Sequence, residues 1–366
     1  MLASLNPIAP VYCVHPNLYA AAVDEFAAGF PGRVLFAVKA NNDPLVLDEL
    51  ASAGIAHYDC ASLDEIALVK SRCPGSQCYL MTPVRLPGAA RKAFEQYETR
   101  HFMVDDVGAV APLAEEIDAS TCVIFARMAV HHDSAVEDLS SKFGAAPEDI
   151  PQILETIRKI GAEPALAFNV GSGVRDPLAY AHAIDVAKGV LEDLPFRIRL
   201  VDIGGGFPRN YPGYEVPALE AYFDVIREHA VQMPLAENAE LLAEPGRALA
   251  APGLSTVARV LLRKKDRIYI NDGMYGAFWE LRFNGHKRHA VKAYRDGERI
   301  ENGVEQFVVF GPTCDSSDRL PERVGLPRDI RVGDFIEFEA TGAYSLSGRT
   351  DFNGFYSDTV VRITAR

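Results

Sequence analysis

The residue with the most chemical promise is Lys39, a lone cation that closes the apolar run 34–38 and precedes a turn at 40–44. A lysine at the carboxyl end of a buried strand lies where α/β barrels keep their reactive groups. We expect burial there to disfavour the ammonium form and to leave an amine that can attack a carbonyl. A lysine also ends many strands simply by extending to water, so this interpretation needs partners elsewhere in the chain.

Three consecutive glycines, Gly204, Gly205 and Gly206, follow another strand-like segment. Without Cβ atoms, their backbone N–H groups can approach an anion closely. The loops after the last two strands of an α/β barrel often hold a phosphate, and this spacing differs from the dinucleotide-binding fingerprint. Ser172, in the turn 170–173, adds a hydroxyl donor. The alternative, a tight turn without a ligand, explains three glycines after a strand less well.

The motif Glu-Pro-Gly-Arg at 244–247 follows the last strand-like segment of this alternating region. Arg247 can pair with a phosphate, and Glu244 can present a carboxylate to a pyridine nitrogen and keep it protonated. The alternative is an ion pair between the two at the surface. An amine, a phosphate cradle and an acid for a ring nitrogen are together what pyridoxal phosphate requires.

Short β-rich segments alternate with helical ones from about residue 33 to 250. Eight such alternations favour a parallel sheet closed into a (β/α)8 TIM barrel over a doubly wound open sheet. The predicted strands are 33–39, 57–62, 78–82, 101–104, 122–129, 165–170, 197–203 and 240–243. Predicted helices include 16–29, 44–53, 63–71, 150–160 and 177–191.

After residue 252 the pattern changes to short strands separated by Gly, Asn and Asp turns, at 256–262, 267–270, 306–310, 334–339 and 356–363. These predict an antiparallel β domain, a sandwich or barrel. Residues 12–14 add a candidate strand to it. The expected division is a barrel at 16–250 and a β domain formed by 1–15 and 251–366.

Composition excludes several classes of function. A formal net charge of −13 over 366 residues argues against nucleic acid as a partner. We expect no contact with a membrane, since no apolar run reaches the length of a span, and the first residues lack the pattern of a secretion signal. The six cysteines and nine histidines show no metal-ligand spacing, so no metal and no disulfide framework are expected. A cytoplasmic enzyme fits these features best.

The ordered motifs resemble those of the fold-type III pyridoxal-phosphate decarboxylases, whose barrel is alanine racemase-like and which include ornithine, lysine/ornithine and diaminopimelate decarboxylases. They are FAVKAN at 36–41, DCAS at 59–62, KFG at 142–144, VGSG at 170–173, DIGGGFP at 202–208, EPGR at 244–247, NDGMYG at 271–276, GPTCD at 311–315 and FNGF at 352–355. The resemblance runs over nearly the whole chain and is greatest to ornithine decarboxylase-like members, which implies polyamine biosynthesis.

The resemblance implies a role for each matching residue. Lys39 holds the cofactor covalently and Glu244 contacts the pyridine nitrogen. Cys314 returns a proton to the α-carbon, and Asp315 binds the far amine of a diamino acid; both act from the second subunit of an obligate homodimer. The remaining cofactor contacts are Asp59 and Arg127 around the ring and aldehyde, and Ser172, Gly204, Gly205, Gly206, Gly246, Arg247 and Tyr344 at the phosphate.

The chain departs from the family pattern at two places. Asn169 stands where the family has a histidine stacked on the cofactor ring. Phe283 and Asn284 stand where ornithine decarboxylases have a Tyr-Asp pair, and Arg282 comes just before them. The predicted substrate-binding residues are Asp315, Arg282, Phe283, Asn284 and Phe352.

These departures leave the substrate open. One reading is a basic L-amino acid such as ornithine or lysine. The other is a diamino acid whose far end is acylated or carries a carboxylate, as in diaminopimelate or a siderophore or antibiotic pathway, because Arg282 suits a carboxylate. Against diaminopimelate, that branch has glutamate after the cysteine, whereas this chain has Asp315. Arg282 and Asn284 could instead simply point to solvent.

Two further functions remain as rivals. A racemase of the related fold places an arginine against the ring nitrogen, whereas Glu244 makes the ring a stronger electron sink and favours decarboxylation. A non-catalytic protein like the antizyme inhibitors shares the fold, but retention of Lys39, Glu244, Arg247 and Cys314 argues against it.

Overall fold

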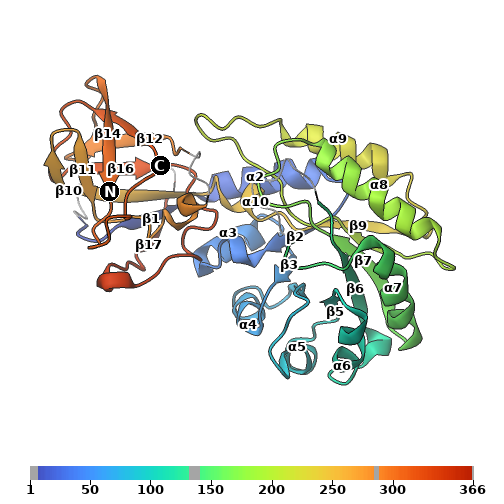
Figure 1. Cartoon of the computed structure of the whole chain (residues 1–366). Coiled ribbons are helices and arrows are strands. Elements are labelled where there is room, and N and C mark those ends of the chain that lie inside the picture. The colour runs from blue at the N-terminus through green and yellow to red at the C-terminus, as the bar shows by residue number, and fades with distance from the viewer. Residues whose placement is uncertain (1–6, 132–140, 284–287, 365–366) are drawn as a thin grey trace.

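A computed structural model describes residues 7–131, 141–283 and 288–364. It contains a closed barrel of eight parallel strands and a separate nine-stranded sheet (Figure 1). The predicted combination of a (β/α)8 barrel with a C-terminal β domain is therefore confirmed.

The barrel strands follow one another in sequence order, and β2 closes the circle by pairing with β9. Alternate residues of each strand face opposite sides: Leu35 lies in the barrel interior, whereas Phe36 packs under the helices. The strands are β2 (Gly32–Ala37), β3 (His57–Cys60), β4 (Gln77–Leu80), β5 (His101–Val104), β6 (Val123–Met128), β7 (Glu163–Phe168), β8 (Leu200–Asp202) and β9 (Glu240–Ala243).

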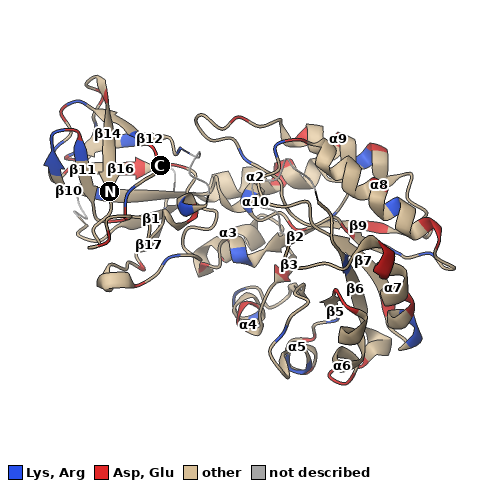
Figure 2. Cartoon of the chain, viewed as in Figure 1, with Lys and Arg blue, Asp and Glu red and all other residues tan. Residues whose placement is uncertain are grey.

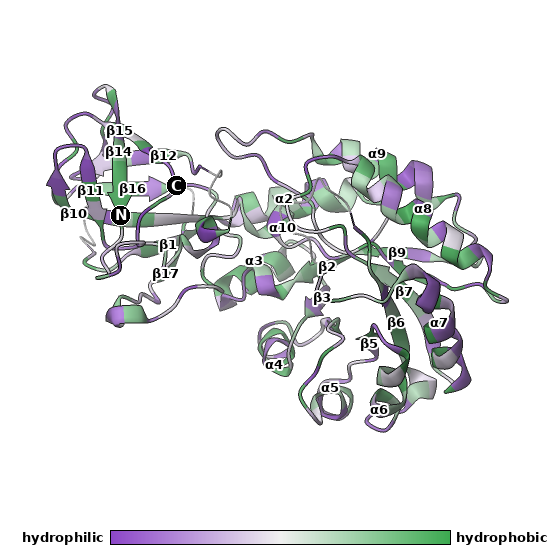
Figure 3. Cartoon of the chain, viewed as in Figure 1, coloured by the Kyte–Doolittle hydropathy of each residue, from purple (hydrophilic) through white to green (hydrophobic). Residues whose placement is uncertain are grey.

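Helices cover the outside of the barrel (Figure 1). Their charged residues lie on outward turns (Figure 2), whereas the barrel strands are largely hydrophobic (Figure 3). The helices are α2 (Pro16–Gly29), α3 (Pro44–Ser52), α4 (Leu63–Arg72), α5 (Ala89–Tyr97), α6 (Val110–Ala114), α7 (Ile150–Lys159), α8 (Leu178–Glu192), α9 (Leu219–Ala230) and α10 (Arg247–Ala250). The starts of α3 and α4 are encoded locally, because the side chains of Asp43 and Ser62 accept hydrogen bonds from N–H groups of the first turn.

The β domain is a mixed sheet rather than a purely antiparallel one. Strand β1 pairs antiparallel with β10 and parallel with β17, and β11 pairs parallel with β14. Strands β12, β13 and β15 were not anticipated from the sequence. The strands are β1 (Val11–Val14), β10 (Leu254–Lys264), β11 (Arg267–Ile270), β12 (Val291–Arg295), β13 (Glu298–Arg299), β14 (Val304–Phe310), β15 (Val324–Pro327), β16 (Phe335–Phe338) and β17 (Val360–Arg362).

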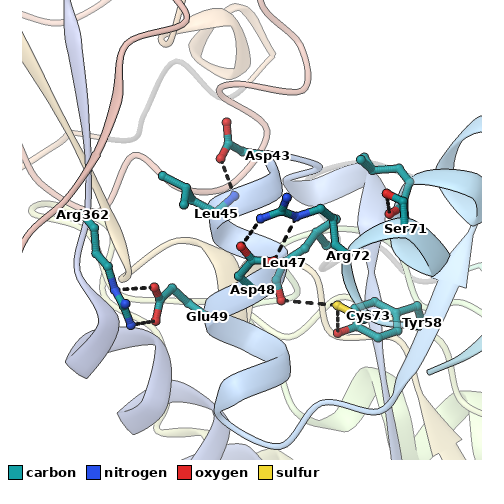
Figure 4. Close-up of polar contacts among 11 residues, drawn as sticks. Asp43, Leu45, Leu47, Asp48, Glu49, Tyr58, Ser71, Arg72, Cys73 and Arg362 are labelled. Atoms are coloured by element: carbon teal, nitrogen blue, oxygen red, sulfur yellow. Dashed lines mark hydrogen bonds and ion pairs between the residues drawn. The ribbon is translucent and has the colours of Figure 1, made fainter. Parts of the chain in front are cut away.

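Helix α3, which follows the segment of Lys39, is bonded to its surroundings on two sides (Figure 4). Arg362 of β17 forms a two-pronged ion pair with the buried Glu49, at 2.7 and 3.0 Å. On the barrel side, the Cys73 thiol donates to the backbone oxygen of Leu47 and accepts from the Tyr58 hydroxyl. The β domain thereby helps to fix the helix that begins just after Lys39.

Candidate active site

Lys39 lies just beyond a strand end rather than within the strand. Strand β2 ends at Ala37, and Lys39 is the middle residue of the 3₁₀ turn η1 (Val38–Ala40). The β-domain side of the chain holds this turn, because Tyr344 N–H donates to Ala40 O at 2.7 Å and Ser347 Oγ donates to Lys39 O at 2.9 Å. The turn is therefore shaped by residues some 300 positions away in sequence.

The amine of Lys39 is charged in the ligand-free protein, which corrects the expectation that burial frees it. Lys39 Nζ lies 2.8 Å from Oδ2 of Asp59, at the end of β3. Burial alone lowers the pKa of Lys39, but the carboxylates of Asp59 and Glu244 outweigh it and hold that pKa above its ordinary value. The side chain is also 46% exposed, so desolvation is incomplete. Lys39 must therefore lose a proton before it can act as a nucleophile.

One pocket at the carboxyl ends of the barrel strands collects most of the predicted cofactor residues. Its lining combines the amine of Lys39, the acid of Glu244, the guanidinium of Arg247 and the glycine loops after β7 and β8. The predicted residues that line it are Lys39, Asn169, Ser172, Gly205, Gly206, Glu244, Gly246, Arg247 and Tyr344. Gly171, Gly173 and Phe207 complete the lining.

The glycines of this pocket are required by close backbone contacts. Gly204 and Gly206 have φ of +72° and +104°, a region that side-chain-bearing residues rarely adopt. A Cβ on Gly206 would lie 2.8 Å from the backbone oxygen of Gly171, and one on Gly204 would lie 2.4 Å from that of Phe168. The loops after β7 and β8 therefore touch through backbone, as a cradle for an anion requires.

Two buried carboxyl groups interact beside the pocket, and one of them, Glu244, lines it. Oδ1 of Asp202, at the end of β8, accepts from Gly204 N–H at 2.8 Å, and Asp202 is also hydrogen-bonded to the side chain of Glu244. Burial and then the neighbouring Asp202 and Asp59 raise the pKa of Glu244 well above its usual range. Burial likewise raises the pKa of Asp202 to about 7, so the pair holds a proton at neutral pH.

Arg247 is buried in the wall of the pocket and is bound from the β domain. It forms an ion pair with Glu280 of the 3₁₀ turn η5 (Trp279–Arg282), and its guanidinium lies 5.2 Å from the ring of Tyr344. Although burial lowers the pKa of Arg247, Glu280 raises it above the ordinary value, so the group stays charged.

The donor set of the pocket fits pyridoxal phosphate. Apart from the proton that it shares with Asp202, Glu244 Oε1 is buried with no hydrogen-bond donor among the described residues, and Nε and Nη1 of Arg247 are buried with no acceptor. An acid oxygen can meet a ring nitrogen, and guanidinium N–H groups with glycine N–H groups can meet a phosphate. The polar atoms left unpaired are thus complementary to the two ends of that cofactor.

Three of the predicted substrate residues, Asp315, Phe352 and Arg282, gather in a second cluster, around Tyr275 on the β domain. The Tyr275 hydroxyl donates to Oδ2 of Asp315, and its ring stacks on Phe352 at 4.4 Å. Arg282 lies over the same ring at 4.0 Å. Hydrogen bonds from Tyr275 and Ser317 lower the pKa of Asp315 to about 2.

Other predicted residues lie outside the pocket lining. Cys314 is exposed, and its N–H donates to Oδ1 of Asn353 at 3.1 Å. Phe283 packs on Trp279, with ring centroids 4.9 Å apart, and Asn284 lies outside the described residues. Arg127 of β6 lies near Glu244, and its positive charge offsets part of the rise in the pKa of Glu244. Within one chain, Cys314 is thus not among the residues that line the Lys39 pocket.

Two residues of the pocket region were missed by sequence reasoning. Asp202 had a usable signal, because an acid directly before the glycine run ends a buried strand. Glu280 had no such signal in the sequence, since only the packing of η5 against the barrel brings it to Arg247.

All six cysteines are free thiols, and within the described ranges no three His, Cys, Asp or Glu residues form a metal-binding group.

Comparison with known proteins identifies the family. Residues 18–251 match the pyridoxal-binding domain of the pyridoxal-dependent decarboxylases, and residues 252–342 match the C-terminal sheet domain of the same proteins. The chain belongs to the pyridoxal-dependent decarboxylase family. The predictions of this family and of its pyridoxal phosphate cofactor are thereby confirmed.

Individual members of the family share about a quarter to a third of their residues with this chain. Ornithine decarboxylase of Caenorhabditis elegans is 30% identical over 345 residues, which cover 87% of this chain and 79% of that protein. Antizyme inhibitor 2 of Xenopus laevis is 28% identical, over 90% of this chain and 75% of its own length.

Solved structures of the family superpose on the whole chain. The lysine/ornithine decarboxylase of Vibrio vulnificus, complexed with putrescine, has a TM-score of 0.85 at 27% identity, and the match covers 99% of this chain and 96% of that chain.

None of the helices in the described part of the chain is long and apolar enough to cross a lipid bilayer.

Proposed function

We propose that this family member removes the carboxyl group of a basic L-amino acid, or of a derivative of one, to give an amine and carbon dioxide. The observation that carries the proposal is the single pocket in which Lys39, Glu244 and Arg247 each present a different group. Bound there, pyridoxal phosphate supplies a sink for the electrons left when a carboxyl group departs.

The roles of the pocket residues follow from their contacts. Lys39 would attach the cofactor through its amine. Asp59 accepts a hydrogen bond from the ammonium form of Lys39 and stabilises it until Lys39 loses a proton. Burial raises the pKa of Glu244 well above its usual range, so its carboxyl group can give a proton to the ring nitrogen and keep that nitrogen protonated. Asn169 accepts from Gly171 N–H at 3.0 Å, which fixes its amide against the pocket where the ring face would lie.

The phosphate end has its own group of donors. We assign it to Arg247, Tyr344, the hydroxyl of Ser172 and the glycines 204–206 and 246. Tyr344 has a φ of +55°, and its N–H is bonded to Ala40 O, so the β-domain side of the chain places this residue beside the Lys39 turn. Arg127 is assigned to the ring side, next to Glu244.

We further propose a homodimer in which Cys314 and Asp315 of one subunit complete the Lys39 pocket of the other. The absence of both residues from the lining of the Lys39 pocket within one chain supports this arrangement. Mixing Lys39→Ala subunits with Cys314→Ala subunits tests it, because a two-fold hybrid then contains one site with both residues intact. Random mixing should restore about a quarter of the wild-type activity; failure to restore any activity in proven hybrids would refute the shared site.

The substrate class depends on the cluster around Tyr275. Asp315 already accepts from Tyr275, from Ser317 N–H at 2.9 Å and from Ser317 Oγ at 2.7 Å, which leaves it few free lone pairs for an ammonium group. Among the described residues, the only hydrogen bond of Arg282 is from Nε to Met274 O. A far end that is acylated or carries a carboxylate therefore remains an alternative to ornithine or lysine.

One experiment tests the role of Lys39 in holding the cofactor. Purified protein is incubated with pyridoxal phosphate, reduced with borohydride and digested, and the labelled peptide is sequenced. We expect the label on Lys39 in the wild type and in Lys159→Ala, a control on the exposed face of α7, and no label in Lys39→Ala. A label elsewhere, or none in the wild type, would contradict the assignment.

Release of carbon dioxide distinguishes the candidate functions. Ornithine, lysine, arginine, diaminopimelate and mono-acylated diamino acids are assayed with the holoenzyme. The antizyme inhibitor relationship makes a non-catalytic protein the second candidate. That candidate predicts no carbon dioxide from any of them, and a racemase predicts exchange of the α-proton alone.

Three broader assignments accompany this function. We propose a cytoplasmic location, a role in polyamine biosynthesis, and a division into a barrel of residues 16–250 and a β domain of residues 1–15 and 251–366. Pairing of β1 with both β10 and β17 supports the inclusion of the N-terminal strand in the β domain.

A further inference from the structure

Glu280 is an acid beside the guanidinium that the pocket offers to an anion. It lies on η5 of the β domain and pairs with Arg247, the first residue of α10 on the barrel. The side chains of Glu280 and Arg247 are 12% and 5% exposed, so solvent screens their charges weakly. The pair is therefore an internal feature of the pocket wall and not a surface ion pair.

The contacts of Arg247 divide its guanidinium into two parts. One terminal nitrogen, Nη2, meets Glu280, whereas Nε and Nη1 are buried without an acceptor among the described residues. The same pocket presents Ser172, Gly205 and Gly206. Arg247 thus keeps two N–H groups for an anion while Glu280 cancels its positive charge.

The other cation of the pocket is compensated as well. The ammonium of Lys39 lies 2.8 Å from Asp59, with the Asp202–Glu244 pair nearby. An anion that enters the Arg247 end therefore meets aligned N–H donors but little net positive charge. At low dielectric, one uncompensated charge beside a phosphate dianion changes its affinity strongly.

We propose that Glu280 is a positioning residue whose negative charge orients Arg247 and limits the affinity of the pocket for a phosphate dianion. The inference rests on the proposed function, in which this end of the pocket holds the cofactor phosphate. It assigns to η5 a direct influence on cofactor retention. The same turn carries Arg282, so one short element contacts both the phosphate side and the Tyr275 cluster.

The test is the ratio of two dissociation constants, those of pyridoxal phosphate and of pyridoxal, for the cofactor-free full-length protein. The two probes share the ring and the aldehyde and differ only in the phosphate, so their ratio isolates the anion end. Glu280→Gln keeps a hydrogen-bonding amide beside Arg247 but removes the charge. Inorganic phosphate, added as a competitor of pyridoxal phosphate, provides a second probe.

Glu280→Gln should bind pyridoxal phosphate about tenfold more tightly than the wild type, with pyridoxal affinity unchanged and inorganic phosphate a stronger competitor. Glu301→Gln is the matched control, because Glu301 pairs with Arg299 on an exposed turn. It should leave the ratio unchanged. An unchanged ratio in folded Glu280→Gln, or weaker binding of both probes, would overturn the proposal.

A second variant covers the possibility that Glu280→Gln fails to fold. Glu280→Asp keeps the charge but withdraws it from Arg247, so it should tighten pyridoxal phosphate binding about twofold; no change would overturn the proposal. If the wild type itself gains no visible absorbance and no borohydride-fixed label, the proposed function fails. If it gains both while the ratio stays constant, only the role of Glu280 fails.

Discussion

The buried carboxyl group of Asp202 makes the ligand-free protein less stable as the pH rises. Its Oδ1 accepts from Gly204 N–H, and its side chain is hydrogen-bonded to Glu244. We predict that Asp202→Asn, which keeps the size and a hydrogen-bonding oxygen, relieves this loss and is more stable than the wild type at neutral pH.

The magnitude follows from the shift of the pKa. Burial raises the pKa of Asp202 from an ordinary 3.8 to about 7. Between those values the folded protein retains a proton that the unfolded chain has lost, so the free energy of unfolding falls as the pH rises. Integrated from about pH 4.5 to about pH 7.5, this one group costs the wild type about 3 kcal/mol. Glu244 loses a like-charged neighbour in the variant, which acts in the same direction.

Urea unfolding of the cofactor-free proteins, followed by circular dichroism across this pH range, measures the effect. The quantity of interest is the difference in unfolding free energy between variant and wild type, because titrating groups that do not interact with Asp202 cancel in it. It should grow in favour of the variant by about 3 kcal/mol. Asp193→Asn, at an exposed helix end, is the matched control for the loss of one carboxyl group. A constant or opposite trend for Asp202→Asn would refute the reasoning.

Three other variants probe the cradle and the substrate cluster. Gly206→Ala should bind pyridoxal phosphate poorly and lose about 1–3 kcal/mol of stability in urea, because its Cβ would meet Gly171 O at 2.8 Å; full retention of both would contradict the close backbone contact. Cys314→Ala should keep the cofactor absorbance but slow or misdirect protonation of the product carbon, whereas unaltered turnover and products would remove its proposed role. Arg282→Leu should shift the kcat/KM ratio about tenfold towards substrates with a free distal ammonium, since it removes a cation beside Asp315; an unchanged ratio would show that Arg282 does not select the substrate.

Local patterns in the chain were enough for the architecture of the barrel. Strand β5 and helix α2 have the predicted bounds, because an apolar strand or an amphipathic helix is encoded within a few neighbouring residues. Strands β12, β13 and β15 were missed, since β13 is only two exposed residues long and β12 and β15 are partly buried strands that depend on their neighbours for pairing.

By itself, the sequence determined which residues could perform the chemistry: Lys39, the glycine run at 204–206, Glu244 and Arg247. Their residue types and their places after strands carry that information. Only the tertiary structure decided their charge and their neighbours. Lys39 is an ammonium paired with Asp59, and Arg247 is matched by Glu280 from the β domain, because pKa values and ion pairs depend on groups that folding brings together from distant parts of the chain.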